Sequence, residues 1–145
     1  RAKKLGCKNT HFINPHGLHS RSHYSTAYDL TLIQRECMRH QVYMDIVKKR
    51  SISFSSKGKN KKHYYFEPTD ALLGEVKGLL GGKTGHTSGA GHCFCGMYKY
   101  NGVVYIFTVL GNESSEGRWR DCRKLMKFIR DKGVPVTSGV TPPLK

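Results

Sequence analysis

The stretch Gly81-Gly82-Lys83-Thr84-Gly85-His86-Thr87 opens the most regular part of the chain. We expect a strand from about Leu79 to Thr84 that carries the Lys-Thr-Gly triplet near its end. A second strand follows from His92 to Tyr100, and a third from Val103 to Leu110. The dipeptide Asn101-Gly102 between them is a strong signal for a two-residue hairpin turn. The sequence therefore predicts three antiparallel strands in series, with the triplet on the first.

Apolar residues at helical spacing predict helices on both sides of this sheet in the sequence. Ser25 can cap a helix that runs to about His40, and a short second helix follows it. A third helix spans about Gly117 to Lys132, and Gly133 ends it as a C-cap residue. The apolar positions are Leu30, Ile33 and Cys37 in the first helix, Val42, Ile46 and Val47 in the second, and Trp119, Cys122, Leu125, Met126 and Ile129 in the third.

A second hairpin is predicted between the helices and the sheet. Residues 51–54 alternate like a strand, and residues 63–66 return after a turn rich in lysine and glycine. The lysines could contact phosphates while the aromatic residues after them stack on bases, which would indicate a nucleic-acid site. A solvated hairpin tip explains the same composition without any ligand, and we prefer that interpretation.

Length and composition indicate one domain with a basic surface. The chain has 145 residues, of which 37% are hydrophobic, and its formal net charge is +15 from 25 basic and 10 acidic residues. This charge favours an anionic partner, such as nucleic acid, a cell-wall polymer or a lipid surface. The longest apolar run, 103–110, is far too short to span a membrane.

Cysteine and histidine residues suggest metal sites at first, but neither pattern is convincing. The five cysteines are an odd number, which argues against a full disulfide framework while leaving one bridge possible. Cys93 and Cys95 would share one face of a strand, and buried packing explains them better than metal binding. Asn-Pro-His-Gly at 14–17 is typical of a tight turn. The residues that we therefore interpret as structural are His11, Asn14, His16, His19 and His23.

Four segments together resemble one protein family. They are RAKKLGCKNTHFINPHG at 1–17, HYSTAYDL at 23–30, GKTGHTSGAGHC at 82–93, and the strand end at Val109-Leu-Gly111. The chain resembles the D-alanyl-D-alanine carboxypeptidases of bacterial cell-wall maturation, the low-molecular-mass penicillin-binding proteins, over roughly residues 1–132. Lys-Thr-Gly is the third signature of the serine penicillin-binding and β-lactamase group.

The resemblance implies an α/β (α+β) fold of the penicillin-binding protein and β-lactamase-like transpeptidase type, with a central antiparallel sheet flanked by helices and incomplete in this chain. Residues 1–133 would form the C-terminal part of the catalytic domain, and residues 134–145 an irregular tail that contains prolines. The implied activity is that of a serine-type D-Ala-D-Ala carboxypeptidase, which uses no cofactor or metal. The implied location is outside the cytoplasm, either secreted or anchored to the outer face of the bacterial cytoplasmic membrane.

The resemblance also assigns roles to individual residues, five in all. Lys83 would place a cation in the cleft, and Thr84 would offer its hydroxyl to the substrate carboxylate. Gly85 would let the substrate backbone approach closely. The backbone N–H of His86 would form one half of an oxyanion hole. Arg118, at the start of the last helix, would engage the terminal carboxylate of the substrate through its bidentate fork.

The nucleophilic serine of the resembled family, its lysine and the Ser-x-Asn motif all precede the segment that begins here at Arg1. The string Ser56-Lys57-Gly58-Lys59 fits Ser-x-x-Lys, but it lies in a Gly- and Lys-rich turn and we interpret it as accidental. We therefore expect this chain to supply the Lys-Thr-Gly wall of the site and to be inactive alone. Its partners would be peptidoglycan stem peptides ending in D-Ala-D-Ala, β-lactams, and a missing N-terminal segment that bears the serine.

Other functions stay open at this point. A non-catalytic peptidoglycan-binding or partner-binding fragment would use the same sheet edge without chemistry. A basic nucleic-acid binder would show a steep salt dependence of its DNA affinity. Within the enzyme class, an endopeptidase or a sporulation-specific carboxypeptidase stays open, because specificity depends on the missing half of the cleft.

Overall fold

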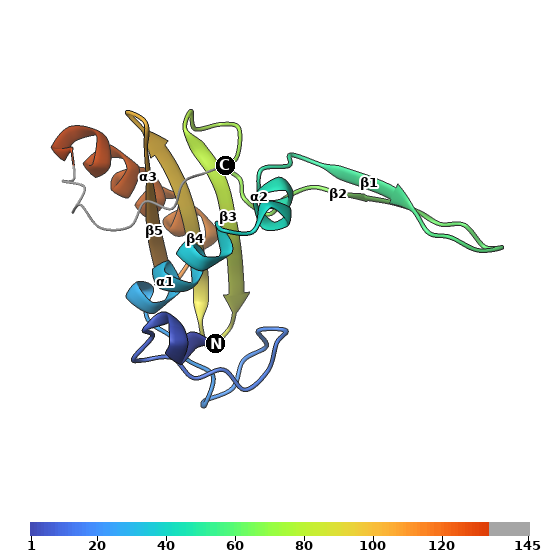
Figure 1. Ribbon diagram of the computed structural model, residues 1–145, viewed down its shortest axis with the longest axis horizontal. Coiled ribbons are helices and arrows are strands. Elements are labelled where there is room, and N and C mark those ends of the chain that lie inside the picture. The colour runs from blue at the N-terminus through green and yellow to red at the C-terminus, as the bar shows by residue number, and fades with distance from the viewer. Residues whose placement is uncertain (134–145) are drawn as a thin grey trace.

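The computed structural model describes residues 1–133, so the tail predicted for 134–145 lies outside the described residues. Two helices cover opposite faces of a three-stranded sheet, and a long hairpin projects away from this body (Figure 1). The elements in chain order are η1 (Ala2–Leu5), α1 (Ala27–Cys37), α2 (Gln41–Val47), β1 (Ile52–Ser55), β2 (His63–Phe66), β3 (Leu79–Thr87), β4 (Gly91–Tyr100), β5 (Val103–Asn112) and α3 (Ser115–Lys132).

The central sheet has the order β3-β4-β5, and all neighbours are antiparallel. Asn101 and Gly102 both have positive φ, as the predicted two-residue turn between β4 and β5 requires. The strand that carries the triplet is longer than predicted. It continues past Thr84 to Thr87, because His86 and Thr87 still pair with His92 and Gly91 of β4. The triplet therefore lies in the middle of an edge strand.

The main core lies between the sheet and α3. Phe94 of β4 packs edge-on against Trp119, with ring centroids 5.2 Å apart. Cys122, Met126 and Ile129 continue this contact at the spacing of a helical stripe. The helical spacing also predicts Leu125 in this stripe, but Leu125 lies at the flank of the helix and is exposed. The other core residues are Leu72, Leu79, Tyr98, Phe107 and Val109.

Helix α1 begins and ends slightly inside its predicted bounds. Thr26, rather than Ser25, is the N-cap residue, because its hydroxyl accepts a hydrogen bond from the N–H of Asp29 at 3.1 Å. The helix stops at Cys37, before His40. Capping of this kind satisfies a backbone donor that the first turn leaves free.

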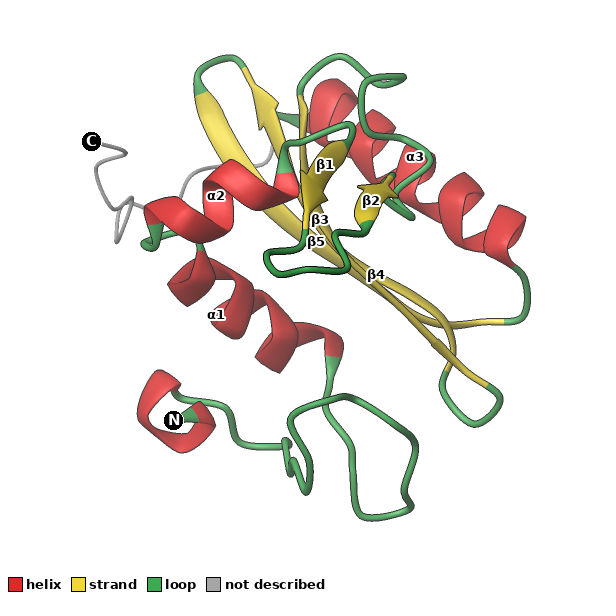
Figure 2. Ribbon diagram, turned by 90° about the vertical axis from the view of Figure 1, so that its right-hand side faces the viewer, coloured by secondary structure: helices red, strands yellow, loops and turns green. Residues whose placement is uncertain are grey.

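The side chains that α1 buries are polar, which the apolar pattern does not predict. Asp29 and Gln34 are buried, whereas the predicted stripe of Leu30, Ile33 and Cys37 is only half buried. The stripe is incompletely covered because it faces a hollow of about 290 Å³ between α1 and the sheet. Figure 2 shows α1 on the side of the sheet opposite α3.

Asp29 ties the N-terminal segment to α1. Its carboxylate accepts hydrogen bonds from the N–H of Lys8 and Asn9 and from the hydroxyl of Thr10, at 3.3, 2.7 and 2.7 Å. The Thr10 hydroxyl, helped by these N–H groups, holds the pKa of Asp29 below its ordinary value against the opposing effect of burial. The predicted turn follows, since Asn14 accepts a hydrogen bond from the N–H of Gly17 at 2.8 Å.

Strands β1 and β2 form the predicted second hairpin as a separate two-stranded sheet. Ile52 pairs with Phe66, and Phe54 pairs with Tyr64. All eight strand residues are exposed. Within the described part of the chain, no helix combines the length and the apolar character needed to cross a bilayer.

Candidate functional site

The Lys-Thr-Gly triplet lies on the edge strand β3, between two hollows that both reach it. One hollow, of about 320 Å³, is bordered by the C-terminal end of α2, the base of the hairpin and residues 67–70. The other, of about 290 Å³, lies beneath α1 and is largely apolar. Lys83 and Thr84 line both hollows. The triplet can therefore be reached from both hollows.

The two polar residues of the triplet point to opposite faces of the sheet. Lys83 pairs with Cys95, and Thr84 pairs with Phe94. Residues directly opposite each other in an antiparallel pair share a face. Cys95 contacts Leu30 of α1, which places Lys83 on the α1 side, while Phe94 packs on α3. The ammonium group of Lys83 is exposed and donates to the carbonyl of its neighbour Thr84.

The hydroxyl of Thr84 is held by a partner that sequence reasoning missed. Thr84 and Thr69 share a hydrogen bond between their hydroxyls. Thr69 in turn precedes Asp70, whose carboxylate accepts from the N–H of Leu72 at 3.1 Å and so fixes the turn before β3. An Asp that can accept from the backbone N–H two residues later is a recognisable turn signal. It indicates the turn but not the contact with Thr84, which is 15 residues away.

Asp70 and Arg118 place opposite charges beneath this part of the sheet. Both side chains are buried, and each keeps one atom, Oδ2 and Nε respectively, without a hydrogen-bond partner among the described residues. Burial raises the pKa of Asp70, although backbone N–H groups of the turn and the charge of Arg118 oppose this effect. Asp70 also lines the larger hollow.

The glycines around the triplet have different structural roles. A Cβ on Gly82 would lie 2.2 Å from the carbonyl oxygen of Cys95, so the close approach of β3 and β4 requires glycine there. A Cβ on Gly85 would meet only the Cβ of Cys93, at 3.9 Å, an ordinary contact. The fold therefore demands Gly82 but not Gly85. Gly85 also lines the hollow beneath α1.

His86 stacks on His92 across the strand pair, with ring centroids 4.0 Å apart. Burial, followed by the nearby charges of His86 and Arg118, lowers the pKa of His92. Two stacked imidazoles next to an arginine disfavour a further positive charge. The predicted role of the His86 backbone N–H stays a prediction.

Arg118 is buried, unlike its helix neighbours Arg120 and Arg123, so it is not the surface arginine that its sequence context alone would suggest. Its guanidinium lies 4.0 Å from the ring centroid of Trp119 and donates to the carbonyl of Cys93 at 3.3 Å. It also donates to the hydroxyl of Ser115 at 3.1 Å. Cys93 is the strand partner of Gly85. Arg118 is thus anchored to β4 beside the triplet.

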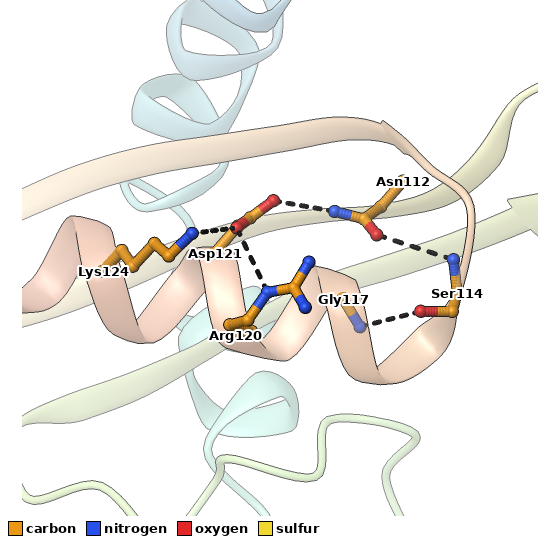
Figure 3. A network of polar contacts seen from close by, with 6 residues as sticks. All are labelled: Asn112, Ser114, Gly117, Arg120, Asp121 and Lys124. Carbon is orange, nitrogen blue, oxygen red and sulfur yellow. Dashed lines mark hydrogen bonds and ion pairs between the residues drawn. The ribbon is translucent and has the colours of Figure 1, made fainter.

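A network of polar contacts holds the start of α3, the helix that carries Arg118 in its first turn (Figure 3). Ser114 is the N-cap residue, and its hydroxyl accepts from the N–H of Gly117 at 2.9 Å. Asn112, at the end of β5, donates to the carboxylate of Asp121 at 2.8 Å. Lys124 pairs with the other oxygen of Asp121 at 3.4 Å. These contacts make the helix begin at Ser115, two residues earlier than predicted, and fix its first turn against the sheet.

The cysteines are structural in character. All five are free thiols. Cys93 and Cys95 share one face of β4 as predicted, and Cys95 is buried against α1, but Cys93 is only half buried, contrary to the prediction. Burial raises the pKa of Cys95 to about 11 and that of Cys122 to about 12, so both thiols stay protonated and unreactive at neutral pH. Among residues 1–133, no three histidine, cysteine or acidic side chains gather as a metal site would require.

Comparisons with known proteins agree on one family. Residues 1–114 match the family model described as D-alanyl-D-alanine carboxypeptidase. The D-alanyl-D-alanine carboxypeptidase DacF of Bacillus subtilis (strain 168) is 29% identical over 135 residues, which is 88% of this chain and 32% of that protein. The D-alanyl-D-alanine carboxypeptidase of Streptomyces sp. (strain K15) is 29% identical over 130 residues, covering 88% of this chain and 45% of that protein.

Solved structures give the same result. The Streptomyces K15 DD-transpeptidase has a TM-score of 0.82 and 30% identity, over 88% of this chain and 50% of that one. Penicillin-binding protein D2 from Listeria monocytogenes, in its cefotaxime-bound form, has a TM-score of 0.75 and 35% identity, over 87% of this chain and 50% of that one. These likenesses confirm the predicted fold. The chain spans between about a third and a half of the length of these relatives.

Proposed function

Because the chain belongs to the D-alanyl-D-alanine carboxypeptidase family, we propose that it forms part of a serine-type enzyme that removes the terminal D-alanine of peptidoglycan stem peptides. In this proposal the chain supplies the Lys-Thr-Gly wall of the active site. The observation that carries it is the placement of the triplet in the middle of an edge strand, open to two hollows. The location outside the cytoplasm, on the outer face of the membrane or secreted, belongs to the same proposal.

The geometry suits a peptide that adds to the edge of β3, which has no strand partner among residues 1–133. An extended peptide can hydrogen-bond to an exposed strand edge, with affinity from the main chain and specificity from neighbouring side chains. Thr84, oriented by Thr69, offers its hydroxyl to the terminal carboxylate of the peptide. The cation of Lys83 favours the same negative charge, and Gly85 leaves room for the peptide backbone.

The reaction proceeds through an acyl-enzyme. A serine hydroxyl, activated by a nearby lysine, attacks the carbonyl carbon of the penultimate D-alanine, and the terminal D-alanine leaves as the free amino acid. Water then hydrolyses the ester and restores the serine. The serine and its lysine come from polypeptide outside residues 1–145, and β-lactams acylate the same serine. Residues 1–145 alone are therefore inactive.

Charge stabilisation during this reaction falls to His86 and Arg118. The backbone N–H of His86 supplies one donor of the oxyanion hole, and loss of one such donor typically costs about 2.7 to 4 kcal/mol of transition-state stabilisation. Arg118 adds a buried positive charge beside Gly85 through its contact with Cys93, which favours the anionic end of the peptide. Its Nη1 and Nη2 groups each make one hydrogen bond in the fold, to Cys93 and to Ser115, and each keeps a second N–H that can donate to a carboxylate.

A second candidate is a binding fragment without chemistry. The observation that favours it is that the only Ser-x-x-Lys string in the 145 residues, Ser56 to Lys59, lies in the exposed loop between β1 and β2, far along the hairpin from the triplet (Figure 1). Such a fragment would bind stem peptides through the edge of β3 and form no covalent adduct.

Intact-mass measurement after incubation with a labelled penicillin tests the proposal. A covalent adduct on the natural polypeptide that contains this sequence, or on a companion chain that co-purifies with it, supports the enzyme. No adduct, together with retained peptide binding, supports the binding fragment instead.

Binding of a soluble peptide ending in D-Ala-D-Ala tests the role of the triplet. Thr84→Val should abolish binding, because it removes the hydroxyl and keeps the shape of the side chain. The matched control is Thr87→Val on the same strand, whose hydroxyl accepts from the N–H of Ala90 at 3.1 Å. Equal binding by both variants would contradict the proposed role of Thr84. An amidated peptide terminus should weaken binding to the wild-type chain if the carboxylate is recognised.

A further inference from the structure

The hairpin formed by β1 and β2 presents one aromatic face to solvent. Its strand register places Ile52, Phe54, Tyr64 and Phe66 on the same face. Phe54 stacks on Tyr64 with ring centroids 5.4 Å apart, and on Phe66 at 6.0 Å. Each of these four side chains is between 37% and 51% exposed. A row of exposed apolar side chains of this kind marks an interaction surface more often than an inert one.

The loop that closes the hairpin carries only positive charge. Residues 51–66 contain no acidic residue. Backbone and hydroxyl contacts between Ser56 and Lys62 close the loop, at 2.8 and 3.0 Å. The lysines of the loop, all exposed, are Lys57, Lys59, Lys61 and Lys62. The hairpin therefore combines an aromatic face with a cationic tip.

The aromatic face is continuous with the groove at the triplet. Ile52 and Phe66, at the base of the hairpin, line the hollow of about 320 Å³ that Lys83 and Thr84 also line. From there the hairpin extends away from the body of the molecule (Figure 1). A ligand that enters this hollow and is long enough will continue onto the aromatic face and reach the tip.

We propose that this hairpin is an arm that holds a polymeric substrate, a glycan strand that carries several stem peptides. The inference rests on the proposed function and extends it. One stem peptide lies against Lys83 and Thr84, the sugar rings of the strand pack on the face around Phe54 and Tyr64, and the lysines of the tip pair with carboxylates of neighbouring stem peptides. Sugar rings present C–H faces that pack well on aromatic rings. The hydroxyl groups at the edges of the sugar rings stay hydrated in this arrangement.

The continuity with the groove favours this ligand over other anionic partners. Single-stranded nucleic acid could use the same lysines and rings, and an anionic lipid surface could accept the whole face. Binding of either ligand to the lysines and rings would not require contact with the hollow that Ile52 and Lys83 both line. A peptide-bearing polymer uses the hollow, the face and the tip together.

Co-sedimentation of the 145-residue chain with insoluble peptidoglycan tests the inference. The double variant Phe54→Ser/Tyr64→Ser should bind about tenfold more weakly, because it removes two rings from the contact face. Tyr65→Ser is the matched control, since Tyr65 lies on the opposite face and is 60% exposed. Circular dichroism checks that each variant keeps the fold of the wild type.

A second pair of variants tests the charge of the tip. Lys59→Gln/Lys61→Gln should weaken peptidoglycan binding and reduce its dependence on salt, since exposed charges act through screened electrostatics. Lys3→Gln/Lys4→Gln on η1 removes the same charge from exposed positions elsewhere and should bind like the wild type. Equal binding by the wild type and both hairpin variants overturns the inference. The same result is expected if another segment of the protein covers the aromatic face, and the inference is wrong in that case too.

Soluble peptide binding separates this inference from the proposed function. The hairpin variants should bind a soluble D-Ala-D-Ala peptide like the wild type, whereas Thr84→Val should not. If no chain binds the soluble peptide but peptidoglycan binding still depends on the hairpin, the proposed function fails and the arm stands. If the aromatic variant weakens binding to phosphatidylglycerol vesicles or to single-stranded DNA but not to peptidoglycan, the arm serves another ligand and the inference is wrong.

Discussion

Two alanine substitutions, three residues apart, should separate the needs of the fold from those of the ligand. Gly82 and Gly85 flank Lys83-Thr84 on the same strand. At Gly82 a Cβ would lie 2.2 Å from the carbonyl oxygen of Cys95 and 2.8 Å from the Cα of Gly96, so backbone would have to move. At Gly85 the Cβ would make only the 3.9 Å contact with Cys93.

The expected magnitudes follow from these distances. Gly82→Ala should lower the free energy of unfolding by about 1–3 kcal/mol, the usual cost of forcing atoms into a packed site. Gly85→Ala should change it by less than about 0.5 kcal/mol, as a substitution at an uncrowded position does. Gly85→Ala should nevertheless abolish binding of a soluble D-Ala-D-Ala peptide, because the added methyl group occupies the space that the peptide backbone needs.

Urea denaturation followed by the fluorescence of the single tryptophan, Trp119, measures both stabilities, since this residue is buried in the core. Peptide binding is measured on the same preparations. Two results would contradict this expectation: Gly85→Ala unfolds as easily as Gly82→Ala, or Gly85→Ala binds the peptide as the wild type does. The first result would mean that the fold requires Gly85, and the second that no ligand approaches it.

Three further changes test the core, a helix cap and a buried carboxylate. Met126→Ala should lower the free energy of unfolding in urea by about 2–5 kcal/mol because Met126 is fully buried, whereas Phe128→Ala on the exposed side of α3 should cost far less. Ser114→Ala should cost about 1 kcal/mol in the same assay, because the N–H of Gly117 loses its hydroxyl partner. Asp29→Asn should destabilise the protein at neutral pH, measured as unfolding against pH. Its deficit should shrink as the pH falls below about 4, because the pKa of Asp29 is lowered in the folded state and its stabilising effect disappears as the carboxylate protonates.

The regular elements could be predicted because their patterns are local. Alternation and the Asn101-Gly102 turn locate β4 and β5, and helical spacing locates α3. The end of β3 could not be predicted, because it depends on continued pairing with Gly91 rather than on the residues after Thr84. Strand ends are decided by the partner strand, which a local pattern does not contain.

The polar contacts depend on partners far away in the sequence. Asp29 is buried because Thr10 and two backbone N–H groups satisfy its carboxylate, and Gln34 because the hydroxyl of Tyr43 donates to it at 2.9 Å. Thr69 meets Thr84 across 15 residues. Each of these residues resembles an ordinary exposed polar position in its local sequence, so the local pattern favours the apolar stripe as the buried face of α1. The resemblance to a known family supplied the triplet and Arg118, but not Thr69, which neither motif nor periodicity distinguishes.

The residues of the triplet make fewer contacts within the fold than their neighbours on the strand do. Gly82 is fixed by the close approach of β4, and Thr84 has as its side-chain partner a hydroxyl from a loop. Lys83 takes part in none of the ion pairs among residues 1–133, and its ammonium contacts only the adjacent carbonyl. A Cβ at Gly85 would make only an ordinary contact, with the Cβ of Cys93. A cation, a hydroxyl and an uncrowded backbone that make few other contacts among the described residues are left for a ligand at this strand edge, with Lys83 on one face of the sheet and Thr84 on the other.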